Sequence, residues 1–167
     1  MTKTELSFDI MQFVSVDESR PQIMQPIHYG GSLYATDGRI ALEIPGAGKK
    51  ITRSKFGESA RKIISDAHEN FRDPTRPPAD FQKTKWADCD CVHPHKGPRL
   101  SCHLCDGTGK IESAFGTDCG NHKVFSIYLE KLALLPNVWW DVSTDYGTVI
   151  PFTFEGGRGV VMGMRKA

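Results

Sequence analysis

The chain has 167 residues, of which 39% are hydrophobic and 25% are charged, and its formal net charge is +1. This composition is typical of a globular protein that forms one domain, or one domain with a small insertion. The near-neutral charge excludes a global electrostatic attraction to nucleic acid or to membranes, so any such attraction must be local.

The first part of the chain predicts a helix that is followed by strands. Apolar side chains recur at helical spacing in residues 4–16, and Pro21 disfavours helix at the residue before it. Residues 22–44 consist of apolar stretches that are separated by Gly30-Gly31 and by Asp37-Gly38, and both pairs are turn signals. We therefore expect an amphipathic helix and then antiparallel strands joined by tight turns.

A basic segment comes next. Between residues 45 and 62, six basic residues stand against one acidic residue, Glu58. A solvated surface explains this bias, and so do contacts with DNA phosphates, in which each cation displaces one counterion. The candidate nucleic-acid-binding residues are Lys49, Lys50, Arg53, Lys55, Arg61 and Lys62. Residues 58–71 predict a helix with Ile63 and Ile64 on its apolar face.

The rest of the chain predicts an excursion, a helix and further strands. Residues 72–88 are rich in proline and polar residues and are typical of a linker. Residues 123–135 predict a helix, and the stretches after it predict strands with a turn at Gly156-Gly157. Trp139 and Trp140 are consecutive, so one ring is expected in the core and one outside. The order of elements favours an α+β fold with an antiparallel sheet.

Four of the five cysteines lie within residues 89–109. The chain has no apolar run of the about 20 residues that cross a bilayer and no signal-peptide pattern, so we expect a cytoplasmic protein without membrane contact. Clustered cysteines in a reducing compartment are more often metal ligands than disulfides. The spacing of Cys102 and Cys105 lets one turn present two sulfurs to one ion, and zinc prefers four such ligands.

The predicted site is therefore a structural zinc site, because four protein ligands leave no open position for catalysis. The preferred ligands are Cys89, Cys91, Cys102 and Cys105. His93 or His95 could replace Cys89 or Cys91, and four thiols without a metal remain the other alternative. Residues 102–109 (CHLCDGTG) resemble one repeat of the cysteine-rich region of DnaJ-type chaperones, and the resemblance implies a zinc-binding turn without implying chaperone activity.

Two other features bear on chemistry. Cys119 and His122 form a further Cys/His pair that cannot close a metal site alone, so a buried cysteine is expected there. The chain has neither a P-loop nor a Gly-x-Ser-x-Gly sequence. We therefore expect no enzyme, with a metal-dependent hydrolase as the alternative.

Several segments in order along the chain are similar to the bacterial sliding clamp, the beta subunit of DNA polymerase III. They are residues 17–21 (DESRP), 35–41 (ATDGRIA), Tyr128-Leu129, Pro151-Phe152 and 160–165 (VVMGMR), in which Gly163 stands where the family has proline. The resemblance implies one clamp-like domain, built from two helix-plus-strands units at 1–57 and 120–167. Residues 58–119 are then an insertion that carries the helix at 58–71, the linker at 72–88 and a zinc knuckle at 89–109.

The same resemblance implies a function. It points to a non-enzymatic clamp-like protein that associates with duplex DNA or with replication proteins, and the architecture of a single domain with an insertion suggests a phage origin. A bacterial clamp subunit has several such domains and this chain has one, so a ring would require a homo-oligomer. The alternative is a zinc-knuckle module that binds other proteins and uses the clamp-like domain as a scaffold.

Overall fold

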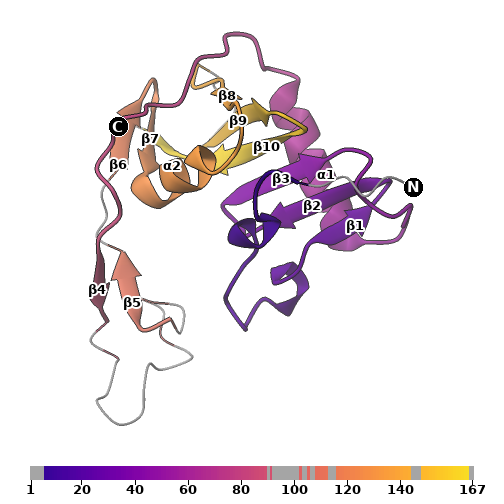
Figure 1. Ribbon diagram of the computed structural model, residues 1–167, viewed down its shortest axis with the longest axis horizontal. Coiled ribbons are helices and arrows are strands. Elements are labelled where there is room, and N and C mark those ends of the chain that lie inside the picture. Colours follow the sequence, from indigo (N-terminus) through magenta and orange to yellow (C-terminus); the bar gives the residue numbers. More distant parts are fainter. Residues whose placement is uncertain are drawn as a thin grey trace.

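The computed structural model describes residues 6–89, 91, 102, 105, 108–112, 116–143 and 148–165. In these ranges the chain is an α+β protein with an antiparallel sheet, as the sequence predicts, and it has two α-helices and a main sheet of six strands (Figure 1). None of the helices in these ranges is long and apolar enough to cross a bilayer. The sheet order is β1 (Ile27–Tyr29), β2 (Ser32–Thr36), β3 (Ile40–Ile44), β10 (Gly157–Met162), β9 (Val149–Phe154) and β8 (Trp139–Trp140).

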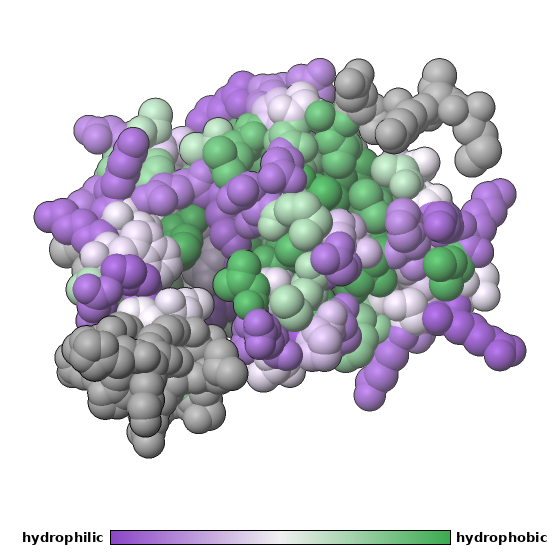
Figure 2. Space-filling view, turned by 60° about the horizontal axis from the view of Figure 1, so that its bottom comes forward, coloured by the Kyte–Doolittle hydropathy of each residue, from purple (hydrophilic) through white to green (hydrophobic). Residues whose placement is uncertain are grey.

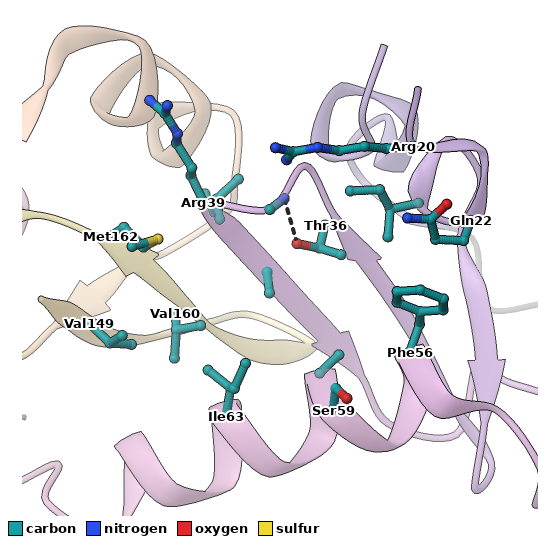
Figure 3. A pocket seen from close by; sticks show the side chains of 15 residues that line it. Arg20, Gln22, Thr36, Arg39, Phe56, Ser59, Ile63, Val149, Val160 and Met162 are labelled. Atoms are coloured by element: carbon teal, nitrogen blue, oxygen red, sulfur yellow. Dashed lines mark hydrogen bonds between the residues drawn. The ribbon is translucent and has the colours of Figure 1, made fainter. Parts of the chain in front are cut away.

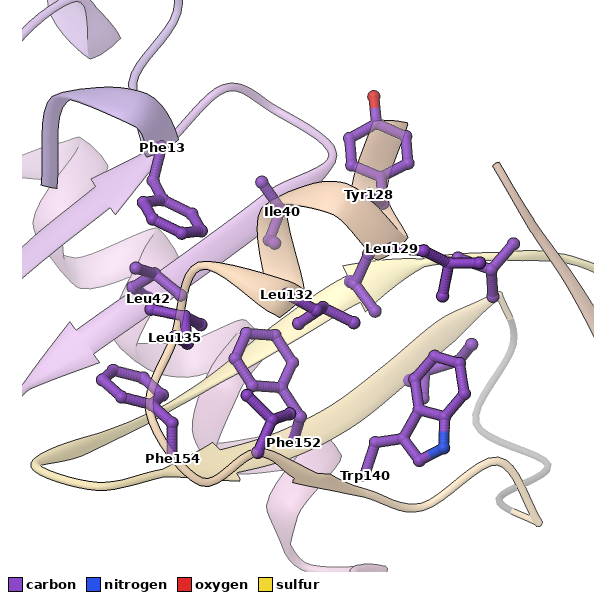
Figure 4. Packing of buried hydrophobic residues seen from close by; sticks show 14 of the residues in the cluster. Phe13, Ile40, Leu42, Tyr128, Leu129, Leu132, Leu135, Trp140, Phe152 and Phe154 are labelled. Atoms are coloured by element: carbon purple, nitrogen blue, oxygen red, sulfur yellow. The ribbon is translucent and has the colours of Figure 1, made fainter. Parts of the chain in front are cut away.

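The two faces of this sheet bury separate cores, because successive side chains of a strand point to opposite faces. Ile40, Leu42 and Ile44 of β3 lie in one core together with α2 (Ser126–Ala133) (Figure 4). The other core contains Tyr34 of β2 and Val160 of β10, and it lies under α1 (Lys55–His68). The pairing of β3 with β10 therefore joins the first and last parts of the chain in one sheet with two covered faces.

The predicted helix at 4–16 is wrong. Residues 10–13 form only a 3-10 turn, η1 (Ile10–Phe13), and a second turn, η2 (Pro21–Ile23), follows. The physical reason is burial, since the consecutive residues Phe13, Val14 and Ser15 are all buried, whereas a helix would bury every third or fourth residue. Tertiary packing of an extended segment overrides the local periodicity here.

The other two predicted helices exist with different bounds. Helix α1 begins at Lys55, before the expected residue 58, because the Ser54 side chain caps it by accepting from Gly57 N at 3.1 Å. Helix α2 begins at Ser126, later than expected, because β7 (His122–Phe125) pairs with β6 (Gly116–Cys119). A short strand β11 (Met164–Arg165) extends this second, three-stranded sheet.

The predicted linker at 72–88 is tied to the main body at its start. Thr75 pairs with Trp140 through two backbone hydrogen bonds of 2.8 and 2.9 Å. Arg76 donates to Val138 O at 3.0 Å and lies over the ring of Trp139, 4.0 Å from its centroid. Trp140 is buried and Trp139 is 38% exposed, which confirms the prediction of one ring inside and one outside.

The buried carboxylate of Asp141 completes this anchor. It accepts hydrogen bonds from Arg72 N at 2.7 Å, Asp73 N at 3.0 Å and both Ser143 N and Ser143 Oγ. Desolvation by burial opposes ionisation, but the bonds from Asp73, Ser143 and Arg72 hold the pKa of Asp141 below its usual value. The ionised carboxylate therefore stabilises the fold.

Asp141→Asn is expected to lower the free energy of unfolding at pH 7 by about 1–3 kcal/mol, because an amide presents a donor where the carboxylate accepts. The contribution of Asp141 to the free energy of unfolding is complete above the pKa of about 3.9 that the group has in the unfolded chain. It is lost as the pH falls through the lower pKa that the group has in the folded protein. Urea unfolding of both proteins at several pH values measures it. The difference in the free energy of unfolding between wild type and Asp141→Asn should narrow in acid. The exposed control Asp80→Asn should have a free energy of unfolding near that of wild type. A gap that does not depend on pH would contradict this role.

Candidate metal centre and binding groove

A two-stranded ribbon carries the predicted metal site. It consists of β4 (Trp86–Asp88) and β5 (Lys110–Glu112), and it extends away from the main body (Figure 1). Cys89 N donates to Gly109 O at 2.9 Å, which continues the pairing toward the cysteines. Gly109 has a φ of 73°, a backbone conformation that glycine adopts readily because it has no side chain. We call this ribbon with its four cysteines the metal arm.

The four predicted cysteine ligands come together. Cys89 Sγ lies 3.7 Å from Cys102 Sγ, Cys91 Sγ lies 3.5 Å from Cys105 Sγ, and all four sulfurs lie within 4.8 Å of one another. A tetrahedral zinc ion with Zn–S distances of about 2.3 Å would separate its sulfurs by roughly 3.8 Å. The cluster could therefore hold one metal ion. The alternative ligands His93 and His95 lie outside the described residues.

The backbone carbonyl of Cys105 is hydrogen-bonded to Thr108. Thr108 N and Thr108 Oγ1 both donate to Cys105 O, at 2.9 and 2.6 Å. Cys89 and Cys105 are buried, while Cys91 and Cys102 are half-buried. An ion held there is largely shielded by four sulfurs, which suits a structural role better than catalysis.

The fifth cysteine is separate from this cluster. Cys119 is buried in the core of the main body, and it lies opposite His122 in the β6–β7 hairpin. The expectation of a buried cysteine at this position is confirmed.

The six basic candidates are exposed on the loop before α1 and on α1 itself. Lys49, Lys50 and Arg53 lie on the loop, and Lys55 and Arg61 lie on the helix. Lys62 also lies on the helix and forms an ion pair of 2.9 Å with Asp66. Their exposure leaves them accessible to phosphates, and contact with DNA stays a prediction.

One buried carboxylate on the α1 face is occupied by internal partners. Glu43 accepts from Tyr34 Oη at 2.9 Å, from Ser32 Oγ at 3.0 Å and from Arg158 Nε at 2.7 Å. Burial, together with the neighbouring Glu43, raises the pKa of Tyr34 to about 12. These contacts are typical of a structural network, because the donors already fill the positions that a substrate would use.

A groove that the sequence did not reveal lies between α1 and the sheet. Its volume is about 540 Å³, which lies in the range of about 300–1,000 Å³ that ligand sites use. Apolar side chains dominate its wall, and Phe56 and Ile63 of α1 stand exposed at its edge (Figure 3). Ile63, which the sequence places on the apolar face of the helix, is 47% exposed and borders the groove.

The opposite wall of the groove comes from two segments that are far apart in the sequence. Thr36 ends β2, Gly38 and Arg39 belong to the turn between β2 and β3, and Val160 and Met162 belong to β10. Met162 N donates to Arg39 O at 2.8 Å, so the two segments are joined directly.

The rim of the groove is positively charged. Arg20 and Arg39 extend their guanidinium groups on the same side of the groove (Figure 3). Arg20 forms an ion pair of 3.5 Å with Asp17 and is half exposed, so it keeps access to solvent. The other polar residues of the lining are Gln22, Thr36 and Ser59. On the molecular face of Figure 2, hydrophobic side chains gather toward the middle and hydrophilic ones lie around them.

No protein-family model, curated protein or solved structure matches this chain.

Proposed function

We propose that the chain is a non-enzymatic, clamp-like protein, of phage origin, that binds replication proteins through the groove. The observation that carries this proposal is the convergence of two distant segments on one apolar groove, which is lined by Thr36, Gly38, Arg39, Ile40 and Ala41 from one segment and by Val160 and Met162 from the other. These residues belong to the two longest segments that resemble the sliding clamp. A shared surface gives a reason for both segments to be present in one small chain.

The occupant that fits the groove is a short segment of a partner protein. Apolar side chains of such a segment would lie between Ile63 of α1 and Val160 of β10, where their burial stabilises the complex. Arg20 and Arg39 at the rim favour an acidic residue in the same segment, because complementary charges select the partner and its orientation. The partner is thus an apolar segment that carries a carboxylate.

Fluorescein-labelled, capped hexapeptides test this proposal. Two neighbouring positions are varied among Leu, Ile, Met and Phe, and a third is Asp, Asn or Lys. Fluorescence anisotropy should show saturable binding of a subset, with Asp peptides tighter than their Lys counterparts by about fivefold, the upper end of what one charge pair at a partly exposed rim supports. Equal affinity for the Asp and Lys peptides would contradict the role of the two arginines.

The second candidate partner is duplex DNA, and the exposed basic residues favour it. If they contact phosphates, binding must weaken steeply as salt rises. Simultaneous replacement of Lys49, Lys50, Arg53 and Lys55 by Gln is expected to weaken binding to a generic duplex at least about tenfold at low salt, because each lost cation removes one released counterion. Anisotropy of a labelled 20-base-pair duplex measures this. An affinity that the four substitutions leave unchanged would contradict DNA contact through this segment.

The metal arm is proposed to bind structural Zn²⁺ through its four cysteines. The described part of the arm is a ribbon of two three-residue strands, which buries little apolar surface by itself. A metal ion supplies folding free energy to an element of this kind.

The alternative function, a zinc-knuckle module that binds proteins, is favoured by Trp86, which is 52% exposed on β4. If the metal arm is the binding surface, Trp86→Ala should weaken binding of the partner, whereas Ile63→Glu in the groove should leave that binding unchanged.

A ring that encircles DNA requires several copies of this chain, and we include a homo-oligomer in the proposal. The mass in solution, measured by analytical ultracentrifugation, decides it. If the protein is a monomer at all concentrations, the ring is excluded, while the proposal that the groove binds a partner is unaffected.

A further inference from the structure

We propose that Lys131 of α2 is a positioning residue for the groove, although it lines no part of it. This inference rests on the proposed function, because it concerns how the groove keeps the shape that binds a partner. Lys131 acts through Asp37, in the turn that supplies Gly38 and Arg39 to the groove wall.

The turn depends on the Asp37 carboxylate. One of its oxygens, Oδ1, accepts hydrogen bonds from Arg39 N at 2.9 Å and from Ile40 N at 3.0 Å. Gly38 N donates to Thr36 Oγ1 at 3.0 Å, and Gly38 has a φ of 94°. The carboxylate therefore holds the conformation of the turn, together with the bond from Met162 N to Arg39 O that ties the turn to β10.

The second oxygen of the carboxylate reaches another layer of the protein. Asp37 Oδ2 lies 2.6 Å from Lys131 Nζ, and the two side chains are only 16% and 18% exposed. The neighbouring Leu129 and Leu132 are buried in the core, so they fix the part of α2 that carries Lys131. The ion pair thus connects the turn at the groove to a helix held by the main core.

Loss of this connection has a defined consequence. Without Lys131 the carboxylate keeps its bonds to the turn, but nothing holds the carboxylate itself to α2. The guanidinium of Arg39 then occupies a wider range of positions at the rim. The groove should lose its preference for acidic segments more than its affinity for apolar ones, because the apolar wall from α1 and β10 stays in place.

The test compares Lys131→Met, which keeps the aliphatic stem, with Lys131→Arg, which keeps the charge. Lys123→Met on β7 is the matched control, since it removes one lysine from the same body at a position outside the groove lining. Amide hydrogen exchange followed by NMR reports on Arg39 N and Ile40 N, and hexapeptide anisotropy reports on the groove.

We expect Lys131→Met to speed exchange at these two amides at least about tenfold, as the loss of about 1.4 kcal/mol of local stability would do. The advantage of Asp over Lys peptides should shrink at least about threefold, a change within the range for one partly exposed charge pair. Lys131→Arg and Lys123→Met should resemble wild type. Unchanged exchange at both amides, or an equal rise throughout the sheet, would overturn the inference. If wild type binds no peptide, the proposed function fails, while the exchange result still decides whether Lys131 holds the turn.

Discussion

Replacing Cys102 and Cys105 together by serine is expected to reduce the zinc content of the purified protein from about one ion per chain to none. Four thiolates hold structural zinc with apparent binding free energies of about 10–16 kcal/mol. Removal of one sulfur from each close pair, Cys89–Cys102 and Cys91–Cys105, leaves two ligands. Two ligands do not close a tetrahedral site, and serine oxygen is a poor replacement for thiolate.

The loss of structure that follows from zinc removal should be confined to the metal arm. Amide hydrogen exchange at Cys89 N, which donates to Gly109 O, should become fast. The amides of the six-stranded sheet should keep their protection from exchange. Elemental analysis by mass spectrometry gives the zinc content, and Cys119→Ala is the control because Cys119 lies in the main core. Full zinc content in the double variant would contradict a site made by these four cysteines. Cobalt substitution, read from its thiolate charge-transfer absorption, separates four sulfurs from three sulfurs and a histidine.

The second large effect is expected from Ile63→Glu, which should reduce hexapeptide binding by at least about a hundredfold. A carboxylate at the edge of the groove would be desolvated by an apolar occupant without a partner, at a cost of several kcal/mol. It would also repel the acidic residue of the proposed partner segment. Because Ile63 is about half exposed, the fold should tolerate the change.

Leu134→Glu is the matched control for this variant. Leu134 is also about half exposed, but it follows α2 and does not line the groove. It should bind the peptides as wild type does. Equal loss of binding in both variants would indicate a general loss of structure, and unchanged binding in Ile63→Glu would place the peptide elsewhere.

The strands were predictable because their signals are local. Gly30 and Gly31 both adopt positive φ in the β1–β2 turn, and the Asp37 side chain closes the next turn on its own backbone. Alternation along β3 puts Ile40, Leu42 and Ile44 on one face. Spacing alone also identified the four cysteines that come together.

The remaining features depend on contacts between distant segments. Residues 4–16 have helical periodicity, but Phe13 and Val14 pack side by side into the core as part of an extended chain. The groove is assembled from η2, β2, the β2–β3 turn, β3, α1, β9 and β10, so no single stretch of sequence contains it. Gly163 donates its N–H to Thr148 O at 2.7 Å, a bond between distant parts of the sheet region that proline could not form at this position.

The most direct test of the central claim is an NMR titration of the isotope-labelled, zinc-loaded chain with the tightest Asp-containing hexapeptide. We predict saturable shifts at the amides of Gly38, Arg39, Ser59, Ile63 and Met162, which surround the groove. The shifts should be absent in Ile63→Glu and present in Leu134→Glu. Absence of saturable shifts at millimolar peptide, or shifts confined to the metal arm, would contradict a groove that binds a partner segment.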